Sequence, residues 1–136
     1  MVCINCTNSK TSVINSRTHK NAPQVWRRRR CAQCHCTFTT YERASMHDEF
    51  KVKGRKGVTS PFDPGRLIRD ITACFGHNPK QASHAYWLEK TIEDKLLTLK
   101  ILTLSTQEIT SATHEVISAF DKLAGDQYAA RHKLLI

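Results

Sequence analysis

Two short cysteine pairs, Cys3-Ile4-Asn5-Cys6 and Cys31-Ala32-Gln33-Cys34, decide how the first third of this 136-residue chain folds. A Cys-x-x-Cys turn brings two thiolates close enough to share one metal ion, and two such turns supply the four ligands of a closed tetrahedral Zn²⁺ site. Such a site has no open position for catalysis, so its role is structural. The spacing therefore predicts a small β zinc ribbon held by Cys3, Cys6, Cys31 and Cys34.

Other potential ligands lie beside or beyond these pairs. His35 and Cys36 follow the second pair directly, and an exchange of Cys36 for Cys34 is an alternative, although the symmetry of the spacing favours Cys34. The segment from Cys31 to His35 also matches the pattern of haem attachment, but that interpretation leaves the first pair unused. Cys74 lies on an apolar helical stripe, where a small buried side chain is the simplest interpretation.

Short alternating segments surround the cysteines at residues 12–15 and 36–41, and polar turns separate them. This pattern is typical of brief strands rather than helices. A β-module of this size buries too little surface to fold unaided, so a structural metal would supply the missing stability.

Basic residues concentrate in the same part of the chain. Residues 1–60 contain twelve Lys and Arg against three acids, whereas residues 61–136 contain nine of each, so the net charge of +9 belongs to the first part. The run Arg27–Arg30 directly precedes the second cysteine pair on an expected strand, with Arg17 and Lys20 in the neighbouring segment. A charge run is often only a solvated face, but a rigid basic β-surface is suited to binding phosphates. We therefore predict a nucleic-acid partner.

The rest of the chain changes to helical periodicity after a basic hairpin at residues 49–60. Asp63 and Pro64 start a first helix, a second runs from Ala85 to Leu99, and a capping box at residues 105–108 opens a third. Gly125 is expected to stop the third helix, and residues 127–135 to form a last short one. The predicted fold class is α+β: a small N-terminal β zinc ribbon, followed by a β-hairpin and a helical bundle.

Several functional classes are excluded by what the sequence lacks. Its apolar runs are only a few residues long, so no transmembrane helix is expected. The N-terminal sequence does not resemble an export signal, and we expect a cytoplasmic protein whose cysteines are not disulfide-bonded. The histidines are scattered, and neither paired carboxylates nor a nucleophile elbow is present, so the chain is not expected to be an enzyme.

Several motifs agree in order and spacing with one known family. The cysteine pairs, the arginine run, Val13-Ile14-Asn15-Ser16-Arg17 and Phe38-Thr39-Thr40-Tyr41-Glu42-Arg43 resemble the zinc ribbon of NrdR, the bacterial repressor of ribonucleotide reductase genes. The remainder resembles the ATP-cone that follows the ribbon in that family. The resemblance implies a DNA-binding ribbon over residues 1–46 and an ATP-cone for nucleotide sensing and oligomerisation over residues 47–136.

The resemblance also implies roles for individual residues. The residues expected to contact double-stranded DNA are Arg17, Lys20, Arg27, Arg28, Arg29, Arg30 and Arg43. Those expected to hold ATP or dATP are Val52 against the purine and Lys53, Arg55, Lys56 and Arg66 at the phosphates. The two nucleotides would favour different homo-oligomers, and the absence of a Gly-Lys-Ser/Thr loop suggests binding without hydrolysis.

Two departures from the family keep a second hypothesis open. The arginine run abuts Cys31 with Trp26 before it, and the hairpin turn is Lys53-Gly54-Arg55-Lys56-Gly57, one residue longer than the family's. The alternative is a zinc-ribbon adaptor, or a regulator of a phage or mobile element, whose degenerate cone serves only for oligomerisation.

Overall fold

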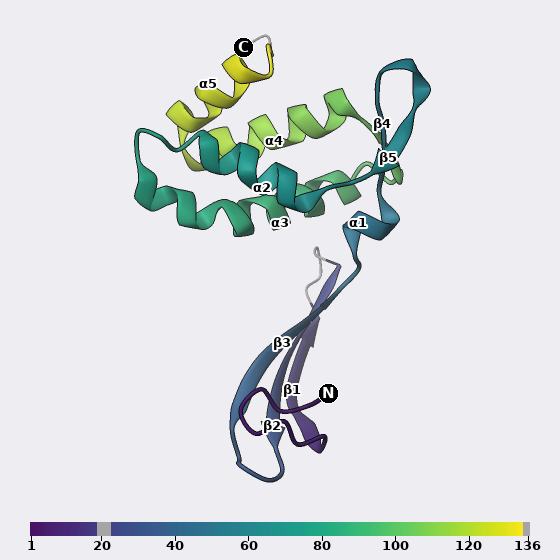
Figure 1. The fold of residues 1–136 in the computed structure, drawn as a ribbon, viewed down its shortest axis with the longest axis vertical. Coiled ribbons are helices and arrows are strands. Elements are labelled where there is room, and N and C mark those ends of the chain that lie inside the picture. Colours follow the sequence, from purple (N-terminus) through teal and green to yellow (C-terminus); the bar gives the residue numbers. More distant parts are fainter. Residues whose placement is uncertain (19–22, 135–136) are drawn as a thin grey trace. The chain divides into compact units, whose positions relative to one another are not determined.

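The computed structural model describes residues 1–18 and 23–134, and it divides into two compact units, Met1–Ala44 and Ser45–Ile136. The first unit is built of strands and the second of a small sheet and helices (Figure 1). This confirms the predicted α+β class. None of the helices in the described ranges has the length and apolar character needed to cross a bilayer.

The first unit is a three-stranded antiparallel sheet in the order β1-β2-β3. Its strands are β1 (Thr11–Thr18), β2 (Gln24–Cys31) and β3 (Thr37–Arg43). β2 is central and carries the arginine run, as predicted. The register of β1 against β2 shifts between Val13 and Asn15, so Ile14 is the extra residue of a β-bulge.

A second three-stranded sheet opens the second unit. After α1 (Met46–Glu49), β4 (Lys51–Lys53) and β5 (Thr59–Pro61) form the predicted hairpin around a 3₁₀ turn at Arg55–Gly57. Its tip turns sharply because Lys56 and Gly57 both have positive φ, 65° and 73°. The third strand, β6 (Thr103–Ser105), pairs in parallel with β4 and was not predicted.

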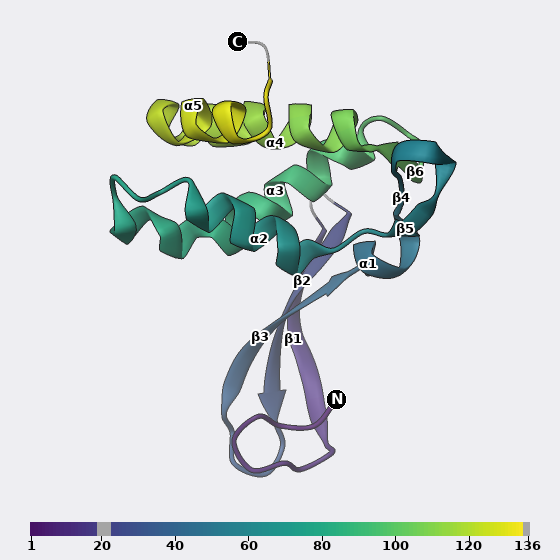
Figure 2. The ribbon, with the colours of Figure 1, turned by 45° about the horizontal axis from the view of Figure 1, so that its top comes forward.

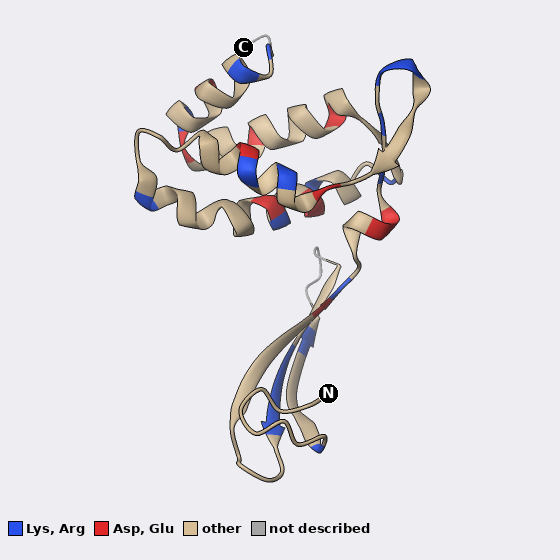
Figure 3. Cartoon of the chain, in the orientation of Figure 1, with Lys and Arg blue, Asp and Glu red and all other residues tan. Residues whose placement is uncertain are grey.

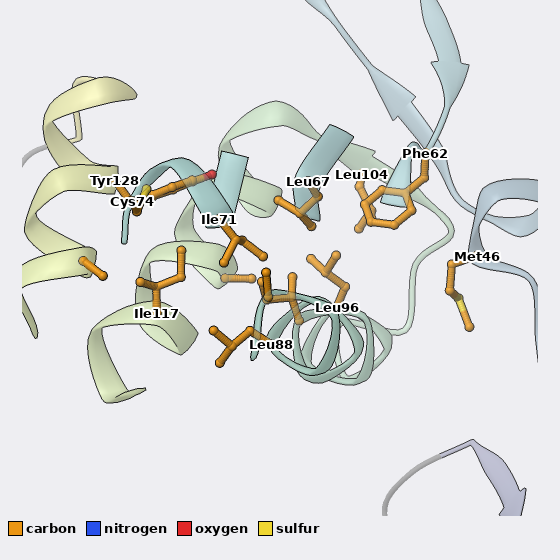
Figure 4. Close-up of a cluster of buried hydrophobic side chains, with 14 of the residues drawn as sticks. Met46, Phe62, Leu67, Ile71, Cys74, Leu88, Leu96, Leu104, Ile117 and Tyr128 are labelled. Carbon is orange, nitrogen blue, oxygen red and sulfur yellow. The ribbon is translucent and has the colours of Figure 1, made fainter. Parts of the chain in front are cut away.

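Four α-helices and a 3₁₀ segment complete this unit. They are α2 (Pro64–Ala73), the 3₁₀ segment Pro79–His84, α3 (Ala85–Leu97), α4 (Thr106–Phe120) and α5 (Lys122–Arg131). In Figures 1 and 2, α4 and α5 run side by side, and α2 lies along α3. Their apolar stripes meet in one core that includes Ile71, Leu96, Leu104, Ile117 and Tyr128, all at most 1% exposed (Figure 4).

The starts of the helices follow local sequence signals, but one predicted end is wrong. Asp63 caps α2 by accepting a hydrogen bond from the backbone N–H of Arg66, and Ser105 and Glu108 form the expected capping box of α4. Gly125, however, does not stop a helix. α4 ends at Phe120, and Asp121 starts α5, which contains Gly125. The glycine is needed there for packing, because its neighbour Ser118 leaves no room for a side chain.

Candidate metal centre and nucleic-acid interface

The four cysteines of the two pairs meet at the end of the first sheet. The Sγ atoms of Cys3, Cys6, Cys31 and Cys34 all lie within 4.8 Å of one another. The Sγ atoms of Cys3 and Cys34 are 3.6 Å apart, and those of Cys6 and Cys31 are 3.5 Å apart. Tetrahedral zinc with bonds of about 2.3 Å places its sulfurs about 3.8 Å apart, so the donor set fits a structural zinc ion.

Backbone amides surround this cluster and favour thiolates. The backbone N–H of Asn5 donates to Cys3 Sγ at 3.3 Å, and that of Gln33 donates to Cys31 Sγ at 3.4 Å. The amide of Cys36, followed by the side-chain amide of Asn5, lowers the pKa of the Cys34 thiol to about 6. Thiolate is the form that binds metal.

Four thiolates at this spacing would repel one another, and a cation relieves that repulsion. The amide of Asn8 favours the thiolate of Cys6, but burial and hydrogen bonds with the other three cysteines raise its pKa to about 12. Zinc removes this conflict because a coordinating thiol is deprotonated outright. The chemistry of the donor set thus agrees with a metal that stabilises the ribbon.

His35 and Cys36 stay outside the group of four. The Sγ of Cys36 contacts the carbonyl oxygen of Thr37 at 3.7 Å, and the cluster found in the described residues contains neither residue. The geometry therefore agrees with the choice of Cys34 over Cys36. Cys74 is buried in the helical core, where its Sγ contacts the carbonyl oxygen of Asp70.

Alternation along β2 divides the arginine run between the two faces of the first sheet. Arg28 and Arg30 lie opposite Thr39 and Thr37 of β3, while Arg27 and Arg29 lie opposite Thr40 and Phe38. Side chains that are neighbours along a strand point to opposite faces. We call the face that carries Arg17, Trp26, Arg28 and Arg30 the Arg28 face, and the other the Arg27 face.

On the Arg27 face, both guanidinium groups contact other residues of the sheet. Arg27 forms an ion pair with Glu42, the only acid among residues 1–44. Arg29 Nη1 lies 3.5 Å from the hydroxyl of Thr11, beside the buried ring of Phe38. These arginines therefore have internal partners.

On the Arg28 face, the contacts found for the arginines are with neutral groups. Arg28 donates from Nη1 to Thr39 Oγ1 at 2.9 Å and from Nη2 to Thr37 Oγ1 at 2.8 Å, both neutral groups. Arg30 is exposed, and the guanidinium of Arg17 lies over the Trp26 ring at 5.7 Å. Figure 3 shows the concentration of basic residues along β2.

Two further residues, Arg43 and Lys20, were predicted to contact DNA. Arg43 Nη1 lies 3.4 Å from the Gln24 side-chain oxygen at the far end of β2 from the cysteines. Lys20 lies outside the described residues.

The second unit contains a cavity of about 350 Å³ beside the hairpin. Among the predicted nucleotide residues, Val52 and Arg66 line it, and Arg55 lines an adjoining cavity of about 920 Å³. Lys53 and Lys56 line neither cavity. Alternation in β4 explains the position of Lys53, because it points to the face opposite Val52.

Residues from α4 and α5, which the sequence analysis missed, complete both cavities. Thr106, Thr110 and His132 border the two, and Tyr128 borders the smaller one with His132 stacked on its ring at 4.2 Å. Burial raises the pKa of Tyr128 to about 12. The spacing of Tyr128 and His132 by four residues shows that they share a helix face, but nothing local indicates that this face meets the hairpin.

Comparisons with known proteins agree with this architecture. Residues 1–42 match the family described as "Transcriptional repressor NrdR-like, N-terminal domain". Over 133 residues the chain is 29% identical to the transcriptional repressor NrdR of Bordetella petrii, covering 98% of this chain and 84% of that protein. It is also 29% identical to the NrdR of Deinococcus radiodurans over 133 residues, covering 98% of this chain and 82% of that one.

A further relative is the NrdR of Persephonella marina, 29% identical over 124 residues, which cover 91% of this chain and 81% of the relative. These relatives carry the name of transcriptional repressors, the kind of protein that the sequence predicted. Residues 1–42 thus match the NrdR-like N-terminal domain, and the chain as a whole is similar in sequence to the NrdR repressors.

Proposed function

We propose that this protein is a DNA-binding transcriptional repressor whose second unit, an ATP-cone, binds ATP or dATP. The observation that carries the proposal is the Arg28 face, a basic surface on the central strand of a metal-stapled sheet that matches the NrdR-like ribbon. The full-length homology to repressors supports the same function. Its place of action would be the cytoplasm, on double-stranded DNA.

The physical support for DNA binding is charge presented on a rigid support. Fixing the cysteine cluster with zinc would hold the backbone of β2 in place, so the strand itself needs little further ordering when its arginines meet phosphates. Each phosphate that is neutralised releases counterions, which makes such binding depend strongly on salt. The proposed contacts remain Arg17, Lys20, Arg27, Arg28, Arg29, Arg30 and Arg43.

The support for nucleotide binding is the cavity beside the hairpin. Its volume of about 350 Å³ lies within the usual range for small-molecule sites, and Val52 supplies an apolar wall while Arg66 supplies a positive charge. Arg55 borders the adjoining cavity, where a phosphate chain would extend. Lys53 and Lys56 would act from the hairpin tip by closing over the phosphates.

Nucleotides would regulate DNA binding if ATP and dATP favoured different assemblies of the protein. A nucleotide shifts an equilibrium between assemblies only by its difference in affinity for them. We propose that ATP and dATP bind the same cone, favour different homo-oligomers, and so change how well pairs of ribbons match two DNA half-sites.

The test of this function measures DNA binding of the zinc-loaded full chain by fluorescence anisotropy at several salt concentrations. A duplex enriched from a randomised pool is compared with a shuffled duplex of the same length. We expect tighter binding of the enriched duplex, with log affinity falling linearly with log salt. Equal, weak binding of both duplexes would remove the repressor proposal.

The second candidate function is a zinc-ribbon adaptor, or a regulator of a phage or mobile element, with a degenerate cone used only to oligomerise. The observation that favours it is that Lys53 and Lys56 line neither cavity. Calorimetric titration with ATP distinguishes the two functions. A nucleotide-sensing cone gives saturable binding, whereas a degenerate cone gives none at millimolar nucleotide.

A further inference from the structure

We propose that Arg28 recognises a guanine edge in the major groove, and that Thr37 and Thr39 are the residues that position its guanidinium for this contact. The inference rests on the proposed DNA binding and names the base-recognising part of that surface. It divides the arginine run by role, with Arg28 recognising sequence and its neighbour Arg30 contacting phosphate.

The hydrogen bonds of Arg28 fix its orientation. Two of its five N–H donors are bound by the hydroxyls of Thr39 and Thr37, at 2.9 and 2.8 Å, on the adjacent strand β3. The guanidinium is therefore held at two separate nitrogens and cannot rotate freely. Three donors remain for a ligand, in a planar arrangement that suits bidentate recognition.

The charge of Arg28 is also preserved, unlike that of Arg27. Glu42, the only acid of residues 1–44, pairs with Arg27 on the opposite face. The two threonines orient Arg28 without neutralising it. Orientation by neutral hydroxyls is what a recognition arginine needs, because a carboxylate would compete with the nucleic acid for the same donors.

The surroundings of Arg28 fit a duplex. Its cross-strand neighbours are Asn15 on β1 and Thr39 on β3, so it lies at the middle of the sheet, between Trp26 and Arg30 on the same face. The major groove admits β-strands, and arginine bound to O6 and N7 of guanine is the commonest base-specific contact. Phosphate contacts tolerate a mobile side chain, which suits the exposed Arg30.

The experiment selects binding sites from a randomised duplex DNA pool with the zinc-loaded full chain. The main variant is Thr37→Val with Thr39→Val, which removes both hydroxyls while keeping β-branched side chains that strands favour. Thr37→Ser with Thr39→Ser retains the hydroxyls and serves as the rescue. Thr40→Val, one residue away on the Arg27 face, is the matched control.

We expect the wild type, the serine variant and Thr40→Val to enrich one site with a fixed guanine. The valine variant should lose about tenfold of its preference for guanine at that position and keep its affinity for shuffled DNA and its salt slope. Arg28→Lys, which keeps the charge but not the planar fork, should lose the same preference. Zinc content of one ion per chain verifies that each ribbon is folded.

Two results would overturn this inference alone. If the valine variant keeps the wild-type guanine preference, the threonines do not position a recognition residue. If Arg28→Lys binds every duplex with the wild-type pattern, Arg28 contacts phosphate only. A wild type that enriches no duplex would instead remove the proposed function, and this inference with it.

Discussion

A Cβ atom placed on Gly125 would lie 2.1 Å from Ser118 Oγ and 2.8 Å from Ser118 Cα, so α4 and α5 cross with the glycine in direct contact with the other helix. Gly125→Ala should destabilise the second unit by about 1–3 kcal/mol. Alanine's better helix propensity, about 1 kcal/mol, does not compensate for a clash that involves backbone. Urea unfolding followed by the helical circular-dichroism signal measures the change.

The control for this substitution is Gly76→Ala, because nothing lies within 4 Å of a Cβ at Gly76. Its unfolding midpoint should stay near the wild-type value. Combining Gly125→Ala with Ser118→Ala should recover little stability, since the contact with Ser118 Cα persists. Full recovery in the double variant would show that only the hydroxyl limits the crossing.

Asp121 links the end of α4 to the start of α5 and makes stability sensitive to acid. The backbone N–H of Ala124, and then the ring of His77, lower the pKa of Asp121 below its ordinary value of 3.8. A depressed carboxyl pKa adds stability above pH 3.8 that is lost as the pH falls through the folded value. Asp121→Asn should therefore lower the urea midpoint at pH 6 and flatten its decline below pH 4.

Asp126→Asn is the matched control for Asp121→Asn. Within the part of the chain that the structure describes, the ion pair of Asp126 is with exposed Lys122, four residues earlier in the same helix. Such surface pairs contribute little to stability. The midpoint of this variant should follow the wild-type curve between pH 3 and 6. A loss equal to that of Asp121→Asn would mean that general surface charge, not the cap, carries the effect.

Removal of one ligand should empty the metal centre. Cys34→Ser should release zinc and unfold the ribbon while the helical unit keeps its circular-dichroism signal, because four thiolates form the site and structural zinc contributes directly to folding. Cys36→Ser should retain one zinc per chain by elemental analysis. The reverse pattern would show that Cys36 is the ligand.

Arg66 is the basic side chain that lines the cavity beside the hairpin. Arg66→Gln should weaken ATP binding about tenfold or more, because a hydrogen bond to a charged group is lost. Arg69→Gln changes an exposed arginine on the same helix that lines neither cavity, and it should leave calorimetric affinity unchanged. Equal losses in both variants would indicate long-range electrostatics instead of a direct contact.

Features that depend on nearby residues were predictable from the sequence. The cysteine spacing anticipated the group of four sulfurs, and the caps at Asp63 and Ser105 were recognised because each cap binds an N–H three residues away. The arginine run was expected on a strand directly before the second cysteine pair, and β2 carries it. Each cap lies within one short segment, and each half of the cysteine cluster is a single four-residue turn.

Features that depend on distant segments were not predictable. β6 has only three residues, too few for a sequence pattern that would predict a strand. It forms because it pairs in parallel with β4, about fifty positions earlier in the chain. Gly125 resembles a helix end, but contact with Ser118 decides its role. Tyr128 and His132 reach the cavity only because α5 folds back along α4.

In the proposed function, one chain couples DNA binding to a bound nucleotide. The most direct test measures the affinity of the zinc-loaded protein for its enriched duplex at one salt concentration. The three conditions are no nucleotide, ATP and dATP. We predict sequence-preferring binding whose dissociation constant differs between the two nucleotides, accompanied by a change of assembly in sedimentation velocity. An identical dissociation constant and an identical assembly under all three conditions would contradict it.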